Sequence, residues 1–169
     1  DVLNAISSKG LKITKPFIGT KFSLGNASFT IIAPNGAGYS NLNNNSVGIK
    51  LVNGNNTFIM CGDAELEAEY DICDNGLDIS ADVLKLGHHG SDTATTEAIL
   101  KAVNPSYAVI SVGEGNQYGH PDNETLQKMI DRNIELFRTD LQGTIIATSD
   151  GENITFNKIG RASCRERVS

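Results

Sequence analysis

The strongest constraint on the fold is an alternation that begins at Thr57, where short apolar segments of strand character take turns with segments of helical character. The expected strands are residues 57–61, 81–86, 107–112 and 135–139, and the expected helices between them are residues 64–74, 95–103 and 123–132. A connection that contains a helix returns the chain to the same edge of a sheet. The alternation therefore predicts four parallel strands in an α/β fold.

The helical segments carry patterns of their own. In residues 64–74, Leu66, Tyr70 and Cys73 share one face, and Gly76 is a plausible stop signal. In residues 123–132, the preceding Asp122 is placed to cap the helix. We expect both helices to serve as crossovers between parallel strands.

The chain before Thr57 has a different rhythm. Residues 22–24, 27–34 and 46–52 read as β-strands, and Gly25-Asn26 and Asn53-Gly54 supply residues that tolerate a positive φ between strands. Residues 144–149 and 153–157, joined by Asp150-Gly151, read as an antiparallel hairpin on the rim of the sheet. The expected order is therefore N-terminal hairpins, then alternating β/α units, then a closing hairpin.

Length and charge limit the classes of protein that fit. The 169 residues suit a single domain, and the net charge of −6 disfavours nonspecific binding of nucleic acid by bulk electrostatics. No apolar run approaches the ~18 residues that span a bilayer, so we expect no membrane contact from this segment. The chain starts at Asp1 with neither an initiator Met nor a signal peptide, which predicts that the natural protein extends upstream.

The C-terminal residues 159–169 form a separate segment. They read IGRASCRERVS, which resembles the conceptual translation of a common short-read sequencing adapter. We therefore expect residues 159–169 to be a non-native tail and residues 1–158 to be part of one domain. The remaining cysteines, Cys61 and Cys73, lack metal-site spacing, and the place of Cys61 in a strand predicts a buried thiol.

Residues with catalytic potential follow the expected parallel strands. The carboxyl ends of such strands open on one edge, where ligands bind in open α/β sheets. The segments at this edge contain every histidine of the chain and two aspartates: Asp63, His88, His89, His120 and Asp140. Carboxylate and imidazole groups on glycine-flanked loops suit a divalent metal such as zinc or manganese.

Each of these residues also has a structural alternative. Asp63 could be the N-cap of the following helix, and His120 lies in a Gly-His-Pro sequence that is common in turns. Neighbouring side chains in an extended segment point to opposite sides. One of His88 and His89 should therefore be a metal ligand, and the other should contact that ligand or the substrate. A catalytic zinc takes about three protein ligands, so Asp63 and one histidine cannot hold a metal tightly.

Five segments together resemble a known family. FIMCGDAE, DVLKLGHHGS, NPSYAVISVG, NQYGHP and FRTDLQGTI are similar, in order and spacing, to the C-terminal half of the metallo-β-lactamase-fold domain in the ComEC family. That family includes the extracytoplasmic hydrolase domain of bacterial DNA-uptake channels and stand-alone secreted relatives. The likeness runs from about Phe22 to Phe156 and implies half of an αββα sandwich.

The resemblance also implies a site and an activity. Asp63 would bridge two divalent metal ions, zinc or manganese, and His89 would ligate one of them. A hydroxide activated by the metals would attack a phosphodiester, DNA being the expected substrate, while His88 and His120 would contact substrate or leaving group as catalytic residues. The implied localisation is extracytoplasmic, secreted or on the outer face of the bacterial membrane. The family's main metal motif, His-x-His-x-Asp-His, is absent here, so we expect the fragment alone to be inactive.

Two other functions stay open, and a third is disfavoured. A secreted phosphoesterase acting on a small or cell-wall phosphodiester would use the same site. A metal-free binding module would result if the upstream ligands had been lost. A doubly wound cofactor-binding protein is disfavoured, because no Gly-x-Gly-x-x-Gly follows the first parallel strand and no Walker-type Lys-Ser/Thr occurs.

Overall fold

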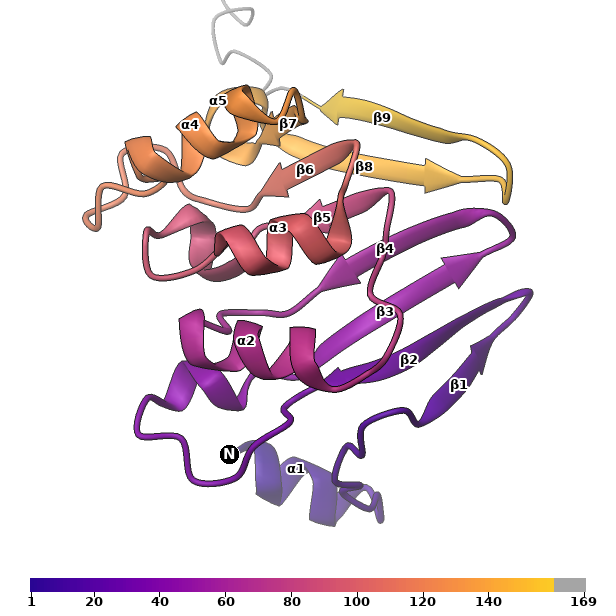
Figure 1. The fold of residues 1–169 in the computed structure, drawn as a ribbon. Coiled ribbons are helices and arrows are strands. Elements are labelled where there is room, and N and C mark those ends of the chain that lie inside the picture. Colours follow the sequence, from indigo (N-terminus) through magenta and orange to yellow (C-terminus); the bar gives the residue numbers. More distant parts are fainter. Residues whose placement is uncertain (160–169) are drawn as a thin grey trace, which may run out of the picture.

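The computed structural model describes residues 1–159 and contains a seven-stranded mixed sheet (Figure 1). Its strands lie side by side in the order of the sequence. They are β1 (Lys21–Leu24), β2 (Ala27–Ala33), β3 (Gly48–Asn53), β4 (Asn56–Met60), β5 (Val83–Lys85), β6 (Tyr107–Ile110) and β7 (Glu135–Arg138). Strands β1 to β4 are antiparallel, whereas β4 to β7 are parallel. The predicted hairpins and the predicted parallel strands are both confirmed.

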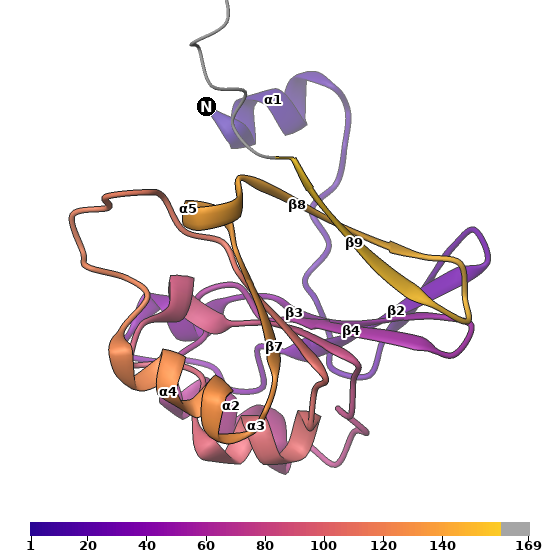
Figure 2. The same ribbon diagram turned by 90° about the horizontal axis from the view of Figure 1, so that it is seen from above.

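Three crossover helices cover one face of this sheet (Figures 1 and 2). They are α2 (Leu66–Asp74), α3 (Glu97–Val103) and α4 (Asn123–Asp131). Each begins within two residues of its expected start, and Thr96 caps α3 by accepting a hydrogen bond from the backbone of Ile99. No helix in the part of the chain that the structure describes is long and apolar enough to cross a membrane.

The core lies between the sheet and these helices. Its strand residues include Ile32, Ile59, Leu84 and Ile110, all of them buried. The helix residues that meet them are Ile72, Leu100, Val103 and Met129.

The face that Leu66, Tyr70 and Cys73 share is not the buried face of α2. Leu66 and Tyr70 are exposed, and the buried residues are Ala68, Glu69 and Ile72. The carboxylate of Glu69 can be buried because both of its oxygens accept backbone hydrogen bonds at the start of α3. A hydrophobic pattern cannot reveal an inward-facing carboxylate whose partners come from a distant segment.

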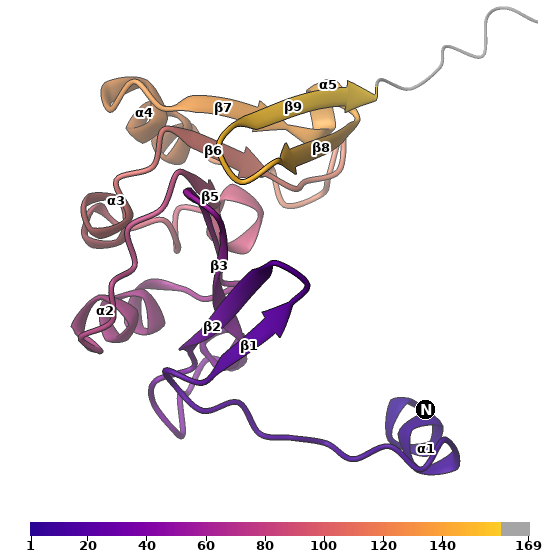
Figure 3. The same ribbon diagram turned by 90° about the vertical axis from the view of Figure 1, so that its right-hand side faces the viewer.

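The closing hairpin forms a separate layer on the face opposite the helices (Figures 2 and 3). Its strands, β8 (Thr144–Ser149) and β9 (Ile154–Ile159), are antiparallel as predicted. The hairpin crosses the sheet instead of extending its rim, because the Phe156 ring stacks on Phe137 of β7 with centroids 4.1 Å apart. At its tip, the carbonyl of Gly151 accepts a hydrogen bond from the backbone of Asn55.

Four short elements complete the described chain. These are α1 (Val2–Ser8), the 3-10 turns η1 (Leu42–Asn45) and η2 (Gly87–Gly90), and α5 (Thr139–Gln142). The sequence analysis did not expect α1, which stands away from the sheet and buries none of its residues (Figure 3). Of the expected tail, Ile159 ends β9, and residues 160–169 lie outside the described residues.

Candidate functional site

The predicted edge of the sheet brings together one aspartate and the three histidines. Asp63 follows β4, His88 and His89 form the turn η2 after β5, and His120 lies in the loop between β6 and α4. The His88 ring lies 6.2 Å from the His89 ring and 5.8 Å from the His120 ring, measured between centroids. The convergence that parallel strands predict is therefore present.

Asp63 and His89 face one another. Oδ1 of Asp63 lies 3.6 Å from Nε2 of His89, and both side chains are nearly half exposed. On the other side of the ring, Nδ1 of His89 lies 2.7 Å from the backbone carbonyl of Ser111. Because a carbonyl can only accept a hydrogen bond, this contact places a proton on Nδ1, and in the neutral ring the Nε2 lone pair is directed toward Asp63.

Asp63 does not cap a helix, so that structural alternative is wrong. The helix begins at Leu66, and Glu65 occupies the N-cap position. The backbone N–H of Asp63 donates a hydrogen bond to Oγ of Ser46, which fixes the turn that contains Asp63. Its carboxylate is thus free of a capping role.

His88 contacts a residue that the sequence analysis did not identify. Its Nδ1 lies 3.1 Å from Oε1 of Glu65 and 3.2 Å from the hydroxyl oxygen of Thr93. Glu65 stands two residues after Asp63 in the motif that carried the family resemblance, which is the signal that could have found it.

The two histidines are not extended, contrary to the geometry assumed from the sequence. His88 and His89 both have positive φ, +43° and +56°. Two consecutive non-glycine residues in this region of φ/ψ space are uncommon and mark local strain. Their rings nevertheless reach different partners, Glu65 for His88 and the carbonyl of Ser111 for His89.

The asparagine-rich segment around η1 supports Glu65. Asn41 and Asn43 donate side-chain hydrogen bonds to the two carboxylate oxygens of Glu65, and Oδ1 of Asn44 accepts from the backbone of Glu65. The acceptor oxygens of this carboxylate are thereby fixed, and with them the orientation of His88.

His120 is held by a carboxylate and stands beside an aromatic ring. Its Nδ1 lies 3.0 Å from Oδ2 of Asp122, and its ring stacks on Tyr118 with centroids 5.9 Å apart. The predicted capping role of Asp122 is not formed: the residue occupies the N-cap position of α4, but its carboxylate contacts His120 and the backbone of Asp92 instead. The imidazole competes for the carboxylate that would otherwise cap the helix.

Gly90 sets the distance between the histidine turn and the His120 loop. A Cβ at this position would lie 2.6 Å from Cβ of Pro121, and the φ of Gly90 is +85°. Only a residue without a side chain allows this approach. Packing against Pro121 therefore explains why glycine follows His89.

Asp140 and Cys61 have structural roles. The Arg138 guanidinium, 2.6 Å from Asp140, lowers the pKa of that carboxyl, and the hydroxyl of Thr139 donates to the carbonyl of Val112. Arg138, Thr139 and Asp140 thus form a salt-bridged corner at the end of β7. Cys61 is buried as predicted, and burial raises its thiol pKa to about 12, so it stays protonated at neutral pH.

Lys85 is a further cation near Asp63 that the sequence analysis did not single out. It pairs with Met60 and Val109 across the sheet, on the face opposite the helices. Its ammonium donates to the carbonyl of Leu86, and burial lowers its pKa while the charge of Asp63 opposes that shift.

Within residues 1–159, no group of three or more His, Cys, Asp or Glu side chains is arranged to hold a metal ion. Asp63 and His89 could supply two ligands to such an ion, since one offers a carboxylate oxygen and the other a neutral imidazole nitrogen.

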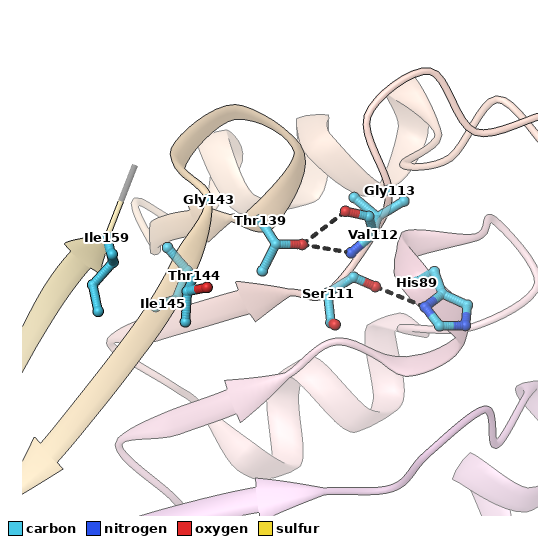
Figure 4. A pocket seen from close by; sticks show the side chains of 9 residues that line it. All are labelled: His89, Ser111, Val112, Gly113, Thr139, Gly143, Thr144, Ile145 and Ile159. Atoms are coloured by element: carbon cyan, nitrogen blue, oxygen red, sulfur yellow. Dashed lines mark hydrogen bonds between the residues drawn. The ribbon is translucent and has the colours of Figure 1, made fainter. Parts of the chain in front are cut away.

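Two hollows lie beside His89. The larger, of about 650 Å³, is bounded by the end of β6, α5 and the start of β8 (Figure 4). The smaller, of about 190 Å³, lies toward the His120 loop. His89, Val112 and Gly113 border both.

Comparison with known proteins shows similarity to three competence and recombination proteins. The chain is 34% identical over 144 residues to ComE operon protein 3 of Bacillus subtilis, which covers 85% of this chain and 19% of the relative. It is 36% identical over 104 residues to Competence protein ComA of Neisseria gonorrhoeae, covering 61% of this chain and 15% of that protein. It is 34% identical over 101 residues to Recombination protein 2 of Haemophilus influenzae, which covers 60% of this chain and 13% of that protein.

These alignments limit what can be transferred from the relatives. The chain spans about a fifth or less of the length of each. No protein-family model matches the chain. The similarity agrees with the resemblance to the ComEC family that the sequence motifs carry. The chain is therefore homologous to a segment of these competence and recombination proteins.

Proposed function

We propose that this chain is the second half of a metallo-β-lactamase-like domain in a metal-dependent hydrolase that cleaves phosphodiester bonds, with DNA as the candidate substrate. Homology to a segment of competence proteins supports the choice of substrate class. The layers also suit half of an αββα sandwich: helices, a mixed sheet, and a hairpin across the second face. By the same relationship we propose an extracytoplasmic location.

One observation carries the metal part of the proposal. The carbonyl of Ser111 fixes the proton of His89 on Nδ1, and the free Nε2 faces Oδ1 of Asp63. Histidines that ligate metals characteristically donate the other ring N–H to a carbonyl or carboxylate. Two ligand atoms about 2.1 Å from one tetrahedral zinc are separated by ~3.4 Å, so the observed 3.6 Å suits a shared ion.

The pair is incomplete as a metal site. Structural and catalytic zinc sites use at least three protein ligands, and the described residues supply two. We propose that the remaining ligands belong to a part of the protein outside this segment. When bound, the metal ions would supply positive charge and lower the pKa of a water molecule toward neutrality.

The other histidines would then act on the substrate. Nδ1 of His120 donates to Asp122, which orients the ring and leaves Nε2 available to exchange a proton with the leaving oxygen. His88 is held in the same way by Glu65, and its Nε2 is available to a phosphoryl oxygen.

A metal-free binding module is the second candidate. The absence of a third ligand group in residues 1–159 is the observation that favours it. The two candidates differ in whether Asp63 and His89 bind a cation at all.

Manganese titration of the 169-residue chain, followed by NMR, tests this difference. Paramagnetic Mn²⁺ should broaden the signals of Asp63 and His89 first, even if a two-ligand site binds weakly. Asp63→Asn and His89→Gln should each abolish the selective broadening. Asp131→Asn, which changes an exposed carboxylate on α4, is the matched control and should leave it intact. Uniform or absent broadening in the unmodified chain would favour the binding module.

Activity is tested in the natural protein that contains this segment. With Mn²⁺ or Zn²⁺ present, it should hydrolyse bis(p-nitrophenyl) phosphate and single-stranded DNA, and Asp63→Asn should lower the rate by roughly 100-fold or more. Turnover that survives this substitution would exclude the proposed site.

A further inference from the structure

The larger hollow beside His89 has a lining without charge. Its residues are His89, Ser111, Val112, Gly113, Thr139, Gly143, Thr144, Ile145 and Ile159, and this set contains no Asp, Glu, Lys or Arg. Figure 4 shows the hollow between the end of β6 and the first residues of β8. Hollows of ~300–1,000 Å³ hold small organic ligands, so its volume of about 650 Å³ suits a ring-sized group.

The lining combines apolar and hydrogen-bonding groups. Val112 and Ile145 provide apolar contact, whereas Ser111 and Thr144 provide hydroxyl groups. The hydroxyl of Thr139 is already engaged, because it lies 2.8 Å from both the backbone nitrogen and the carbonyl of Val112. Such a mixture suits an uncharged polar ring and offers nothing to neutralise a phosphate.

The described charges around the histidines provide no basic track for a nucleic-acid backbone, so a DNA substrate would have to be held here by groups other than its phosphates. Carboxylates of Asp63, Glu65 and Asp122 border the three rings. Of the nearby cations, Arg138 is paired with Asp140, and Lys85 donates to a backbone carbonyl. Binding that follows a nucleic-acid backbone needs a basic track, which this edge lacks among the described residues.

From these observations we infer that the larger hollow is a subsite for one uncharged, ring-sized substituent of the phosphodiester, such as a nucleoside, next to Asp63 and His89. This inference rests on the proposed function, since it assigns the hollow to a part of that substrate. Affinity at this edge then comes from the neutral substituent and not from the phosphate. Inorganic phosphate, which has no such substituent, would be a poor ligand.

Thymidine binding to the 169-residue chain tests the subsite without metal or turnover. In a methyl NMR titration, thymidine should produce saturable shifts of Val112, Thr144 and Ile145, and inorganic phosphate should not. Thr144→Phe should weaken thymidine binding by about tenfold or more, because the ring would occupy the larger hollow. Thr148→Phe, on the same strand and outside the hollow, is the matched control and should bind as the unmodified chain does.

A second blocking substitution is at Gly113, on the side of the hollow opposite Thr144. A Cβ at Gly113 meets nothing within 4 Å, and the glycine is not in the left-handed region, so Gly113→Val adds bulk beside the hollow without a backbone penalty. It should also weaken thymidine binding by about tenfold or more. The inference is overturned if thymidine shifts none of the lining methyl groups, or if both blocking variants bind it unchanged. Selective Mn²⁺ broadening in the same sample would then show that the subsite had failed while the metal site stood.

Discussion

Nε2 of His89 and Oδ1 of Asp63 lie 3.6 Å apart across the ends of two neighbouring parallel strands. The separation is too long for a hydrogen bond, so the two atoms are not each other's partner. The His89 ring is held by the carbonyl of Ser111, and the backbone N–H of Asp63 donates to the hydroxyl of Ser46. These contacts fix the His89 ring and the backbone of Asp63 before any ligand is present.

The first prediction concerns the approach of the histidine turn to the His120 loop. Gly90→Ala should destabilise the chain, because its Cβ would lie 2.6 Å from Cβ of Pro121. Gly76→Ala is the matched control: both glycines have positive φ, but nothing lies within 4 Å of a Cβ at Gly76. The left-handed backbone affects both variants, so the clash should make Gly90→Ala less stable by about 1–3 kcal/mol. Equal urea midpoints for the two variants would show that the loops separate without cost.

The position of the site could be predicted from the sequence, because parallel strands open on one edge whatever their loops do. The alternation after Thr57 was enough to place Asp63, His88, His89 and His120 together. Their partners could not be predicted in this way. Glu65 contacts His88 because an asparagine turn about twenty residues earlier holds its carboxylate, and no local pattern contains that pairing.

The layers of the fold were predicted unevenly for similar reasons. The closing hairpin was found from its turn, but Phe156 stacking on Phe137 decides where it packs. On α2, the buried carboxylate of Glu69 reverses the face that the apolar residues suggested. Both errors arise from long-range contacts that outweigh local pattern.

The second prediction concerns an ion pair between the buried Lys50, on the helix side of the sheet, and the exposed Asp78. The Lys50 side chain is 11% exposed and that of Asp78 is 76% exposed, and Nζ of Lys50 lies 2.9 Å from Oδ2 of Asp78. Asp78→Asn should lower the free energy of unfolding by roughly 1–2 kcal/mol, because it removes the negative charge opposite the Lys50 ammonium and leaves it only neutral carbonyl acceptors. Lys50→Met removes the charge together with its need for a partner and should cost less. Urea unfolding of both single variants and of the double variant measures this, and a larger loss for Lys50→Met would contradict it.

The third prediction is a pH dependence that originates in Glu69. Burial raises the pKa of this carboxyl from its usual 4.5, although hydrogen bonds from the backbones of Thr96 and Thr95 oppose the shift. Since the folded pKa is the higher one, the protonated form contributes stability fully below pH 4.5, and that contribution is lost as pH rises through the folded value. The stability of the unmodified chain should therefore fall relative to Glu69→Gln as pH increases from about 4 to about 8.

The Glu69→Gln variant loses one backbone hydrogen bond at every pH, which lowers its free energy of unfolding by a constant amount. The test is therefore how steeply the free energy of unfolding changes with pH, and not the difference at any one pH. Glu67→Gln, an exposed neighbour on the same helix, should keep the slope of the unmodified chain. Parallel stability profiles for the chain and Glu69→Gln would show that Glu69 titrates alike in the folded and unfolded states.

The last prediction concerns Asn116, which organises the loop that carries His120. Its Nδ2 donates to the carbonyls of Gly113 and His120, and its Oδ1 accepts from the backbones of Tyr118 and His120. Asn116→Ala should speed hydrogen exchange of the Tyr118 and His120 amides by about tenfold or more, because each lost hydrogen bond is worth ~1 kcal/mol.

Gln117→Ala, a change at the exposed neighbour, should leave the exchange of these amides unaltered. The contacts of Asn116 lie within one loop, so the exchange of β6 amides should stay the same in both variants. If Asn116→Ala accelerates exchange across β6 as well, the side chain stabilises the sheet and not merely the loop. In the natural protein, the loosened loop should lower turnover of a phosphodiester more than it weakens substrate binding, because Asn116 acts through the position of His120.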